Sequence, residues 1–376
     1  MKILLLTDGI FPFVMGGMQK HSFYLAQYLE NEGVNVTLAH CVYAPNQLTS
    51  TDEVQQKTGL IKTQIDNFNF PSSNPFPGHY LYNSWRYSQL LWDYYKASIQ
   101  QYDLVYVQGF TAWAWNQNNF KAPIVVNLHG LEMFQTPYSN LDKIEKFLLK
   151  IPAKSILKNA KFAQSLGGQL SAIMQPFCKG VFNCGIGIDD AWFNHNLKDK
   201  EANTPTKFVF VGRYEFRKGL DVLAEVIQSI SNEHQFTIDF IGPIPETLQI
   251  KNPKIKYWGS VKEESKIQAI LDSADVLLLP SRAEGMPTVI LEAMARGLAV
   301  IATDVGAVSE LVSHENGCLI QADQVNDLKM AMLSYINGNS VTLMSQKRAS
   351  QTKVKSYLWS QMIHQYIQHF NKFLTA

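Results

Sequence analysis

The sequence is short of cysteine, and the cysteines it has follow no common pattern. Its 376 residues contain four of them, and no two form a Cys-x-x-Cys pair. So few cysteines cannot build a disulfide scaffold, and their spacing does not match the usual zinc motifs. We therefore expect reduced, mostly buried thiols at Cys41, Cys178, Cys184 and Cys318.

Charge is also scarce. Charged residues make up 17% of the chain, and 33 basic residues against 32 acidic ones leave a formal net charge of +1. A neutral total gives no overall attraction to nucleic acid, so we expect no nucleic-acid partner. Only a local patch of basic residues would bind an anionic surface.

Long apolar runs are absent. No stretch of the sequence reaches the roughly 20 apolar residues that a membrane-spanning helix needs. The run from Ile3 to Leu6 is too short for a signal peptide before Thr7 and Asp8 interrupt it. We therefore expect a cytoplasmic protein that does not span a membrane, with enough hydrophobic residues, 46%, for a globular core.

Two series of alternating strands and helices are present instead, as is typical of parallel sheets in α/β proteins. The first series has expected strands at 2–7, 34–39, 104–107 and 124–128 and a helix over 18–31. The second has expected strands at 207–211, 236–241, 276–279 and 299–302 and helices over 218–230, 263–271 and 288–296.

The polar segment 189–206 separates the two series and is the best candidate for a linker. We therefore predict two Rossmann-like, doubly wound parallel-sheet domains over 1–188 and 207–356. Two such sheets joined by one linker should face a central cleft with the carboxyl ends of their strands, where open α/β sheets bind ligands.

The most informative segment is PSRAEGMPTVILEAMARG at 280–297, which follows a buried strand and leads into a helix. Pro287 suits the first helical position, which puts Glu284 on the loop and Glu292 on the helix. The amides that can bind a phosphate or a sugar hydroxyl at the helix start are those of Gly285, Met286 and Thr288. Two interpretations stay open here: both carboxylates bind a ligand, or Glu284 caps the helix and Glu292 is a solvated acid.

A second segment, VGRYEFRKG at 211–219, also joins a strand to a helix. Arg213 and Lys218 lie five residues apart across a turn. There the arginine can bind two oxygens of a diphosphate and the lysine can add a point charge. The alternative is a pair of surface cations, which the dipole at a helix start disfavours, so the pattern favours a bound anion.

Together the two segments resemble the retaining nucleotide-sugar glycosyltransferases of family four. The resemblance rests on Gly212-Arg213-x4-Lys218-Gly219 followed by Glu284-x7-Glu292, and on the run EGMPTVILEAMARGLAVIATDVGAVSELV. It extends over nearly the whole chain and is strongest from 207 to 320. It implies the two-domain B-type glycosyltransferase fold, with an acceptor domain followed by a donor domain and a last helix, here 357–376, crossing back onto the first domain.

The resemblance also implies a role for each matching residue. Arg213 and Lys218 would hold the diphosphate of the donor and neutralise the leaving group, while Glu284 would accept hydroxyls of the transferred sugar. Glu292 would accept both ribose hydroxyls. The remaining donor contacts would come from Gly16 and Gly17 in a glycine loop of the first domain, from Gly285, Met286, Pro287 and Thr288 at the helix start, and from Val261 beside the base.

His129 ends the expected strand 124–128 and precedes Gly130. A lone histidine is more often structural than functional, but open α/β sheets bind ligands at this end of a strand. The resemblance matches His129 to the family's active-site histidine near the reacting carbon. We expect it to hydrogen-bond the donor sugar rather than to abstract a proton.

The resemblance implies retaining transfer of a sugar to a glycan or glycolipid acceptor, as in bacterial surface polysaccharide or lipopolysaccharide synthesis. No Asp-x-Asp motif is present to bind a metal–diphosphate complex, so we expect transfer with neither metal nor cofactor. The alternative is a partner subunit that binds a nucleotide sugar or a glycan without transferring it. A nicotinamide dehydrogenase is excluded because no Gly-x-Gly-x-x-Gly follows either first strand.

Two segments bear on the acceptor. Residues 75–95 are rich in tyrosine and tryptophan, which either contact sugars or a membrane interface or fill the core of the first domain. Residues 141–161 form a predicted helix that Pro152 kinks or splits, with Leu148, Leu149 and Ile156 opposite a basic face. That face either lies on an anionic membrane or is solvated. Its lysines are Lys143, Lys146, Lys150, Lys154, Lys158 and Lys161.

The C-terminal stretch 357–374 has a helical pattern of apolar residues. Large side chains recur at spacings of three and four, which predicts a packing face. The residues of this face are Trp359, Met362, Tyr366, Phe370 and Phe373.

Overall fold

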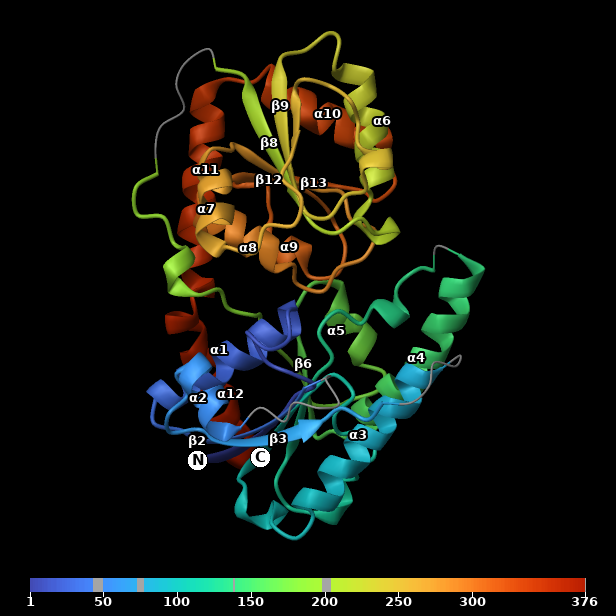
Figure 1. Cartoon of the computed structure of the whole chain (residues 1–376), viewed down its shortest axis with the longest axis vertical. Coiled ribbons are helices and arrows are strands. Elements are labelled where there is room, and N and C mark those ends of the chain that lie inside the picture. The colour runs from blue at the N-terminus through green and yellow to red at the C-terminus, as the bar shows by residue number, and fades with distance from the viewer. Residues whose placement is uncertain (43–49, 73–77, 138, 198–203, 376) are drawn as a thin grey trace. The chain divides into compact units, whose positions relative to one another are not determined.

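The computed structural model describes residues 1–42, 50–72, 78–137, 139–197 and 204–375 (Figure 1). Contacts divide the chain into two compact units. The first unit consists of Met1–Gly187 with Trp359–Ala376, and the second of Ile188–Leu358. Each unit is built around one parallel sheet.

The sheet of the first unit has seven strands in the order β3-β2-β1-β4-β5-β6-β7. In β1 the aliphatic run from Ile3 to Leu6 is fully buried, as expected for a parallel strand covered on both faces. Because β1 pairs with both β2 and β4, the strand order reverses there. The strands are β1 (Lys2–Leu6), β2 (Asn35–Val42), β3 (Gln64–Asn69), β4 (Leu104–Gln108), β5 (Ile124–Asn127), β6 (Phe162–Ser165) and β7 (Val181–Asn183).

Helices cover this sheet, and the last one lies beside the first helix of the chain. The helices are α1 (Gly17–Asn31), α2 (Thr51–Thr58), α3 (His79–Tyr95), α4 (Asn140–Asn159), α5 (Gln169–Met174) and α12 (Trp359–Thr375). α12 packs against α1 (Figure 1). The packing face predicted for α12 is confirmed, since Trp359, Met362, Tyr366, Phe370 and Phe373 are all buried.

α4 differs from the predicted basic face in two respects. Lys146 is buried and pairs with Asp142 at 2.9 Å, so it does not share the solvent-facing side of the other lysines. Leu148 is 37% exposed rather than turned to the core. Of the two alternatives predicted at Pro152, a kink or a split, the split is wrong, because α4 continues through this residue.

The aromatic segment divides between core and surface. In α3, Tyr87 and Tyr95 are buried, and both pack against Phe68 of β3. The exposed fractions lie between 41% and 58% for Tyr80, Tyr82, Trp85 and Tyr94. Residues 75–77 of this segment, which include Phe76, lie outside the described residues.

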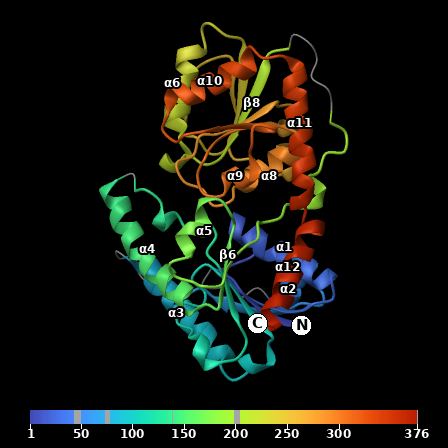
Figure 2. The same ribbon diagram turned by 180° about the vertical axis from the view of Figure 1, so that it is seen from behind.

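The sheet of the second unit has six parallel strands in the order β10-β9-β8-β11-β12-β13. Its strands are β8 (Thr206–Val211), β9 (Phe236–Ile241), β10 (Ile255–Tyr257), β11 (Val276–Leu279), β12 (Ala299–Thr303) and β13 (Gly317–Ile320). Its helices are α6 (Leu220–Ile230), α7 (Glu264–Asp272), α8 (Thr288–Ala295), α9 (Val308–Leu311), α10 (Val325–Ile336) and α11 (Ser340–Val354). α6 and α10 pack against each other (Figure 2).

Both sheets share the Rossmann order 3-2-1-4-5-6, which confirms the predicted fold class of two doubly wound parallel sheets. The described part of the segment predicted as a linker packs on the second unit. Trp192 is buried, and the N–H of Asn194 donates to the carbonyl oxygen of Ala295 at 2.9 Å. Residues 198–203 lie outside the described residues.

Candidate functional site

In the second unit, the loops after β8 and β11 carry the residues predicted to bind a donor. These strands are neighbours, and the strand order reverses between them, which is where open α/β sheets bind ligands. The loops approach closely: a Cβ on Gly219, whose φ is +66°, would lie 2.0 Å from the carbonyl oxygen of Pro280. Glycine is therefore required for the two motifs to meet.

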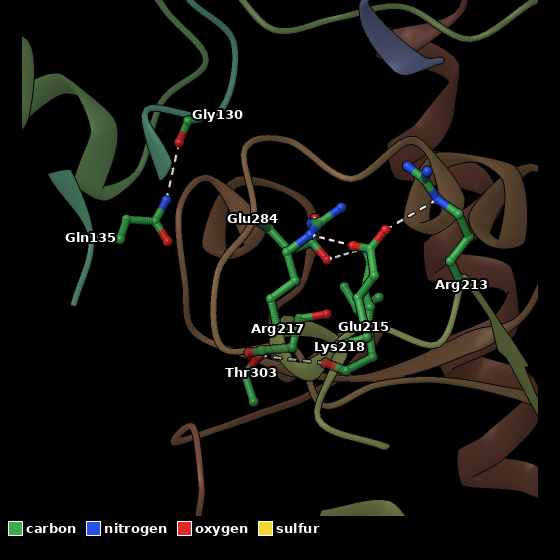
Figure 3. Close-up of polar contacts among 10 residues, drawn as sticks. Gly130, Gln135, Arg213, Glu215, Arg217, Lys218, Glu284 and Thr303 are labelled. Atoms are coloured by element: carbon green, nitrogen blue, oxygen red, sulfur yellow. Dashed lines mark hydrogen bonds and ion pairs between the residues drawn. The ribbon is translucent and has the colours of Figure 1, made fainter. Parts of the chain in front are cut away.

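Lys218 and Glu284, which come from separate motifs, form an ion pair. The Nζ of Lys218 donates to Oε1 of Glu284 at 2.6 Å, and the two side chains are only 12% and 7% exposed (Figure 3). The helix-cap interpretation of Glu284 does not predict this contact. The carboxylate lies against a cation that itself belongs to the predicted diphosphate loop.

Two further charged residues of the same loop, Glu215 and Arg217, were missed by sequence reasoning. The carboxylate of Glu215 lies between two guanidinium groups, 3.2 Å from Nε of Arg213 and 2.7 Å from Nε of Arg217 (Figure 3). Arg217 also reaches Oε2 of Glu284 at 3.7 Å. Arg217 directly precedes Lys218 in the sequence, and this position was a signal that a further cation belongs to the predicted diphosphate loop. The five side chains together carry a net charge of +1, and Arg213 is 74% exposed.

Arg282, another residue that sequence reasoning passed over, ties the two loops together. Its N–H donates to the carbonyl oxygen of Arg217 at 2.7 Å, and its guanidinium donates to that of Phe216 at 2.6 Å. The same group binds both carboxylate oxygens of Asp221, which lowers the pKa of Asp221. Arg282 thus positions the basic loop against the loop that carries Glu284.

The start of α8 is held by a second close approach. Gly285 accepts a hydrogen bond from the N–H of Ala307 at 2.8 Å, and a Cβ on Gly306 would lie 2.1 Å from the carbonyl oxygen of Glu284. α8 begins at Thr288, so Pro287 is the residue before the helix and not its first residue, as had been predicted. The residues that stand at this helix start, as expected from the motif, are Gly285, Met286, Pro287 and Thr288.

Glu292 and Val261 belong to different parts of the second unit. Glu292 lies in α8, one turn beyond Thr288, and Val261 lies in the loop between β10 and α7; both are partly exposed. The loops after β8, β9 and β10 meet at Gly242, whose N–H donates to Gly259 at 2.8 Å. The contacts predicted for Glu292 with ribose and for Val261 with the base stay predictions.

In the first unit, His129 follows β5 with a φ of +57°. Its N–H donates to Oδ1 of Asn127 at 2.8 Å, and its Nε2 lies 2.6 Å from Oε1 of Gln108. Because an amide oxygen only accepts, this contact places the proton on Nε2 and leaves Nδ1 as an acceptor. The loop is closed by Gln135, which donates to the carbonyl oxygen of Gly130 at 3.0 Å (Figure 3).

Burial keeps the His129 ring neutral. Loss of solvation lowers the pKa of His129 to about 3, and it lowers the pKa of the neighbouring His21 well below the ordinary value. The two rings meet edge to face at 5.3 Å. The network continues from Asn127, whose amide donates to the hydroxyl of Tyr106. That hydroxyl in turn donates to Gln164 at 2.6 Å. A neutral hydrogen-bonded network therefore supports this histidine.

The predicted glycine loop leads into α1. Gly16 has an extended backbone, and a Cβ there would lie 2.2 Å from Oε1 of Gln19, so a side chain would displace this amide. The Nε2 of Gln19 donates to Oδ1 of Asp8 at 3.0 Å. Gly17 is the first residue of the helix.

Asp8 is a further residue that sequence reasoning did not select. It follows β1 at the reversal of strand order, and burial raises the pKa of its carboxyl to about 6. Its position directly after the first buried strand was a signal for a ligand-facing residue. Within the described residues, no group of three or more histidine, cysteine, aspartate and glutamate side chains is arranged to hold a metal ion.

Comparisons with known protein families match both units. Residues 15–161 match the family described as Glycosyltransferase Family 4, and residues 205–337 match Glycosyl transferases group 1. The putative teichuronic acid biosynthesis glycosyltransferase TuaC of Bacillus subtilis is 30% identical over 226 residues, which are 57% of this chain and 55% of that protein. The amylovoran biosynthesis glycosyltransferase AmsK of Erwinia amylovora is 28% identical over 41% of this chain and 42% of its own length. The chain thus matches about half the length of these curated relatives.

Solved structures match over the whole length. The sucrose-phosphate synthase from Thermosynechococcus elongatus aligns with a TM-score of 0.77 at 16% identity, covering 100% of this chain and 99% of that one. The lipopolysaccharide outer core galactosyltransferase WaaB aligns with a TM-score of 0.72 at 16% identity and the same coverage. Anabaena HepE in complex with UDP-glucose aligns with a TM-score of 0.66 at 15% identity, covering 99% of each chain. At such identities these structures show a shared B-type glycosyltransferase fold, and with both family matches the chain belongs to glycosyltransferase family 4, the group 1 glycosyl transferases.

Proposed function

We propose that this protein transfers a sugar from a nucleoside-diphosphate sugar to a glycan or glycolipid acceptor, with retention of anomeric configuration and without a metal ion. The observation that carries the proposal is the buried pair of Lys218 and Glu284 inside a basic loop at the reversal of strand order. A cation that neutralises a leaving diphosphate and a carboxylate that accepts sugar hydroxyls are the two groups that this reaction needs side by side.

The donor would bind across the loops of the second unit. Arg213 and Lys218 would contact the diphosphate, and Glu284 would accept sugar hydroxyls. The amides of Gly285, Met286 and Thr288 would contact oxygens of the diphosphate and the sugar. When Lys218 turns toward the phosphates, Arg217 remains close to Glu284 and keeps this carboxylate partly neutralised. Glu292 would accept the ribose hydroxyls, and Val261 would lie beside the base.

In the reaction, the bond between the anomeric carbon and the β-phosphate oxygen breaks, and the electron pair stays with the phosphate. The acceptor oxygen forms its bond on the same face of the sugar, and its proton passes to the departing phosphate. Once the donor is bound, the cations of the basic loop stabilise the developing negative charge. The neutral His129 would accept a sugar hydroxyl at Nδ1, and Gly16 and Gly17 would let the donor approach the start of α1.

The relatives support the acceptor class. TuaC and AmsK are named for the biosynthesis of teichuronic acid and amylovoran, and WaaB for the lipopolysaccharide outer core. We expect an acceptor of this bacterial surface polysaccharide kind, glycosylated in the cytoplasm at the inner face of the plasma membrane. The four cysteines are free thiols, as in other proteins of reducing compartments.

A two-stage experiment tests the proposal. Thermal shifts with UDP, GDP and ADP sugars identify the donor, because a bound ligand raises stability by mass action. Release of the nucleoside diphosphate is then measured with and without polysaccharide repeat-unit acceptors, in the presence and absence of a chelator. We expect acceptor-dependent release that the chelator does not change.

The variant Glu284→Gln should keep donor binding and lose turnover, whereas the exposed control Glu233→Gln should keep both. Donor binding without release for any acceptor would favour a non-catalytic partner subunit. Unchanged turnover of Glu284→Gln would refute the role of this carboxylate.

A further inference from the structure

The outer side of α4 carries a stripe of exposed apolar side chains. The exposed fractions are 81% for Leu141, 59% for Ile144, 67% for Phe147, 37% for Leu148 and 54% for Ile151. At 100° per residue these positions lie within one third of the helix circumference. Single exposed apolar residues are ordinary on a protein surface, but five on one helix face form a contiguous patch that marks an interaction surface.

The orientation of this stripe is fixed by the opposite face of α4. That face buries Pro152, Ala153, Ile156 and Leu157 against the first unit. Ser139 caps the helix by accepting the N–H of Asp142 at 3.0 Å. The buried Lys146 donates to the carbonyl oxygen of Thr136 at 2.9 Å as well as pairing with Asp142. Rotation of α4 to hide the stripe would expose these core residues and separate Lys146 from the carbonyl oxygen of Thr136.

Lysines line one edge of the stripe. Lys143, Lys154 and Lys158 are exposed, and Lys150 is partly exposed. In this fully described helix, Glu145 is the one acidic side chain outside the buried pair of Asp142 and Lys146. The patch therefore combines an apolar centre with a positive edge, although the chain as a whole has a net charge of only +1.

We propose that α4 docks on an anionic lipid bilayer. The apolar stripe would enter the boundary between headgroups and acyl chains, and the flanking lysines would contact acidic headgroups. Figure 2 shows α4 at the outer side of the first unit. A second copy of the chain fits less well, because two such helices would bring rows of lysines together. Within the described parts of the chain, no helix is long and apolar enough to cross the bilayer. The proposal is therefore that α4 lies on the membrane surface.

Vesicle sedimentation tests the proposal with the full chain and no nucleotide sugar, so that its outcome is independent of the proposed transfer. Vesicles of phosphatidylcholine alone are compared with vesicles containing about 30% phosphatidylglycerol at about 0.1 M and about 0.5 M salt. We expect binding to the anionic vesicles at low salt, with an affinity at least tenfold lower on neutral vesicles or at high salt.

Matched variants separate the two parts of the patch. Ile144→Glu with Phe147→Glu should abolish binding, while Met330→Glu with Val341→Glu, at equally exposed apolar positions of the second unit, should not. Lys154→Glu with Lys158→Glu should weaken binding at least tenfold, and Lys62→Glu with Lys251→Glu, an equal change in net charge, should weaken it far less. Equal binding to neutral vesicles, equal loss in the control pairs, or no vesicle binding would overturn the proposal. A dimer dissolved by Ile144→Glu with Phe147→Glu would assign the stripe to a second copy instead.

Discussion

The candidate sites of the two units use opposite chemistry. In the second unit, Arg213, Arg217 and Lys218 surround the carboxylates of Glu215 and Glu284 in a cluster of net charge +1. In the first unit, the neutral ring of His129 is hydrogen-bonded to the amide of Gln108, and its backbone N–H donates to the amide of Asn127. A diphosphate requires compensating charge, whereas a neutral imidazole offers a sugar hydroxyl one directional hydrogen bond. Under the proposed function, the second unit would neutralise the leaving group, and the neutral His129 of the first unit would add a hydrogen bond to the sugar that Glu284 also contacts.

Removal of one cation from the charged cluster should have the largest effect. In Lys218→Met the buried Glu284 loses its 2.6 Å partner, so we expect a loss of about 3 kcal/mol in the free energy of unfolding of the second unit. Turnover should fall by about 10³-fold because the leaving group loses its counter-charge. Calorimetry of the full chain and release of nucleoside diphosphate measure the two effects.

The double variant Lys218→Met with Glu284→Gln separates stability from function. With both charges removed, stability should recover most of the loss, but turnover should stay low. Turnover within tenfold of the wild type in either variant would contradict the assignment of the charged cluster to the leaving group.

The charged site could largely be predicted from the sequence, because its main residues lie in the two loops that follow buried strands β8 and β11. The aliphatic runs before Gly212 and Pro280 located β8 and β11, and the parallel order put their ends together. The partnership of Lys218 with Glu284 was not predicted, since spacing along the chain does not reveal which of several charges will pair. Arg217 was missed for the same reason.

The neutral site and the surface of α4 were harder to predict, because both depend on burial. Gln108 and Asp8 belong to neither of the two charged motifs. Their contacts, Gln108 with His129 and Asp8 with Gln19, become evident only in the folded sheet. Lys146 has the same helical period as its neighbouring lysines, yet it is buried, where it pairs with Asp142 and donates to the carbonyl oxygen of Thr136. The exposed apolar stripe that includes Ile144 and Phe147 was not predicted, because the regular spacing of the lysines determined how this helix was interpreted.

A charge placed in the neutral site should have the second-largest effect. The pKa of His129, about 3, predicts that the wild type shows no change in kcat from this ring between about pH 5 and 8. In Gln108→Glu, a carboxylate beside Nε2 raises the pKa of the ring, and the protonated ring can no longer accept a hydroxyl at Nδ1. We expect kcat to fall by about 10²-fold toward low pH in this variant. The exposed Gln101→Glu should keep the flat profile, and a flat profile for Gln108→Glu as well would contradict the role of the neutral ring.

Asp8→Asn should give the smallest effect, a change in stability. It sharpens the comparison because it removes an ionisable carboxyl from the first unit, whose candidate site is otherwise neutral. Burial raises the pKa of Asp8 from 3.8 to about 6, so the folded state holds this proton more tightly than the unfolded state. The free energy of unfolding therefore decreases as the pH rises from about 4 to about 6 and is then level.

The asparagine side chain of Asp8→Asn cannot ionise, and its amide oxygen can still accept the hydrogen bond from Gln19. The variant should be more stable than the wild type by about 2 kcal/mol at pH 7.5, a rise of several degrees in the first unit's melting temperature, and nearly equal at pH 4. Asp93→Asn, on the exposed surface of α3, should change stability by less than about 0.5 kcal/mol at both pH values. A variant less stable than the wild type at pH 7.5 would mean that the ionised carboxylate belongs to the folded state, and the first unit would then hold a fixed charge like the second.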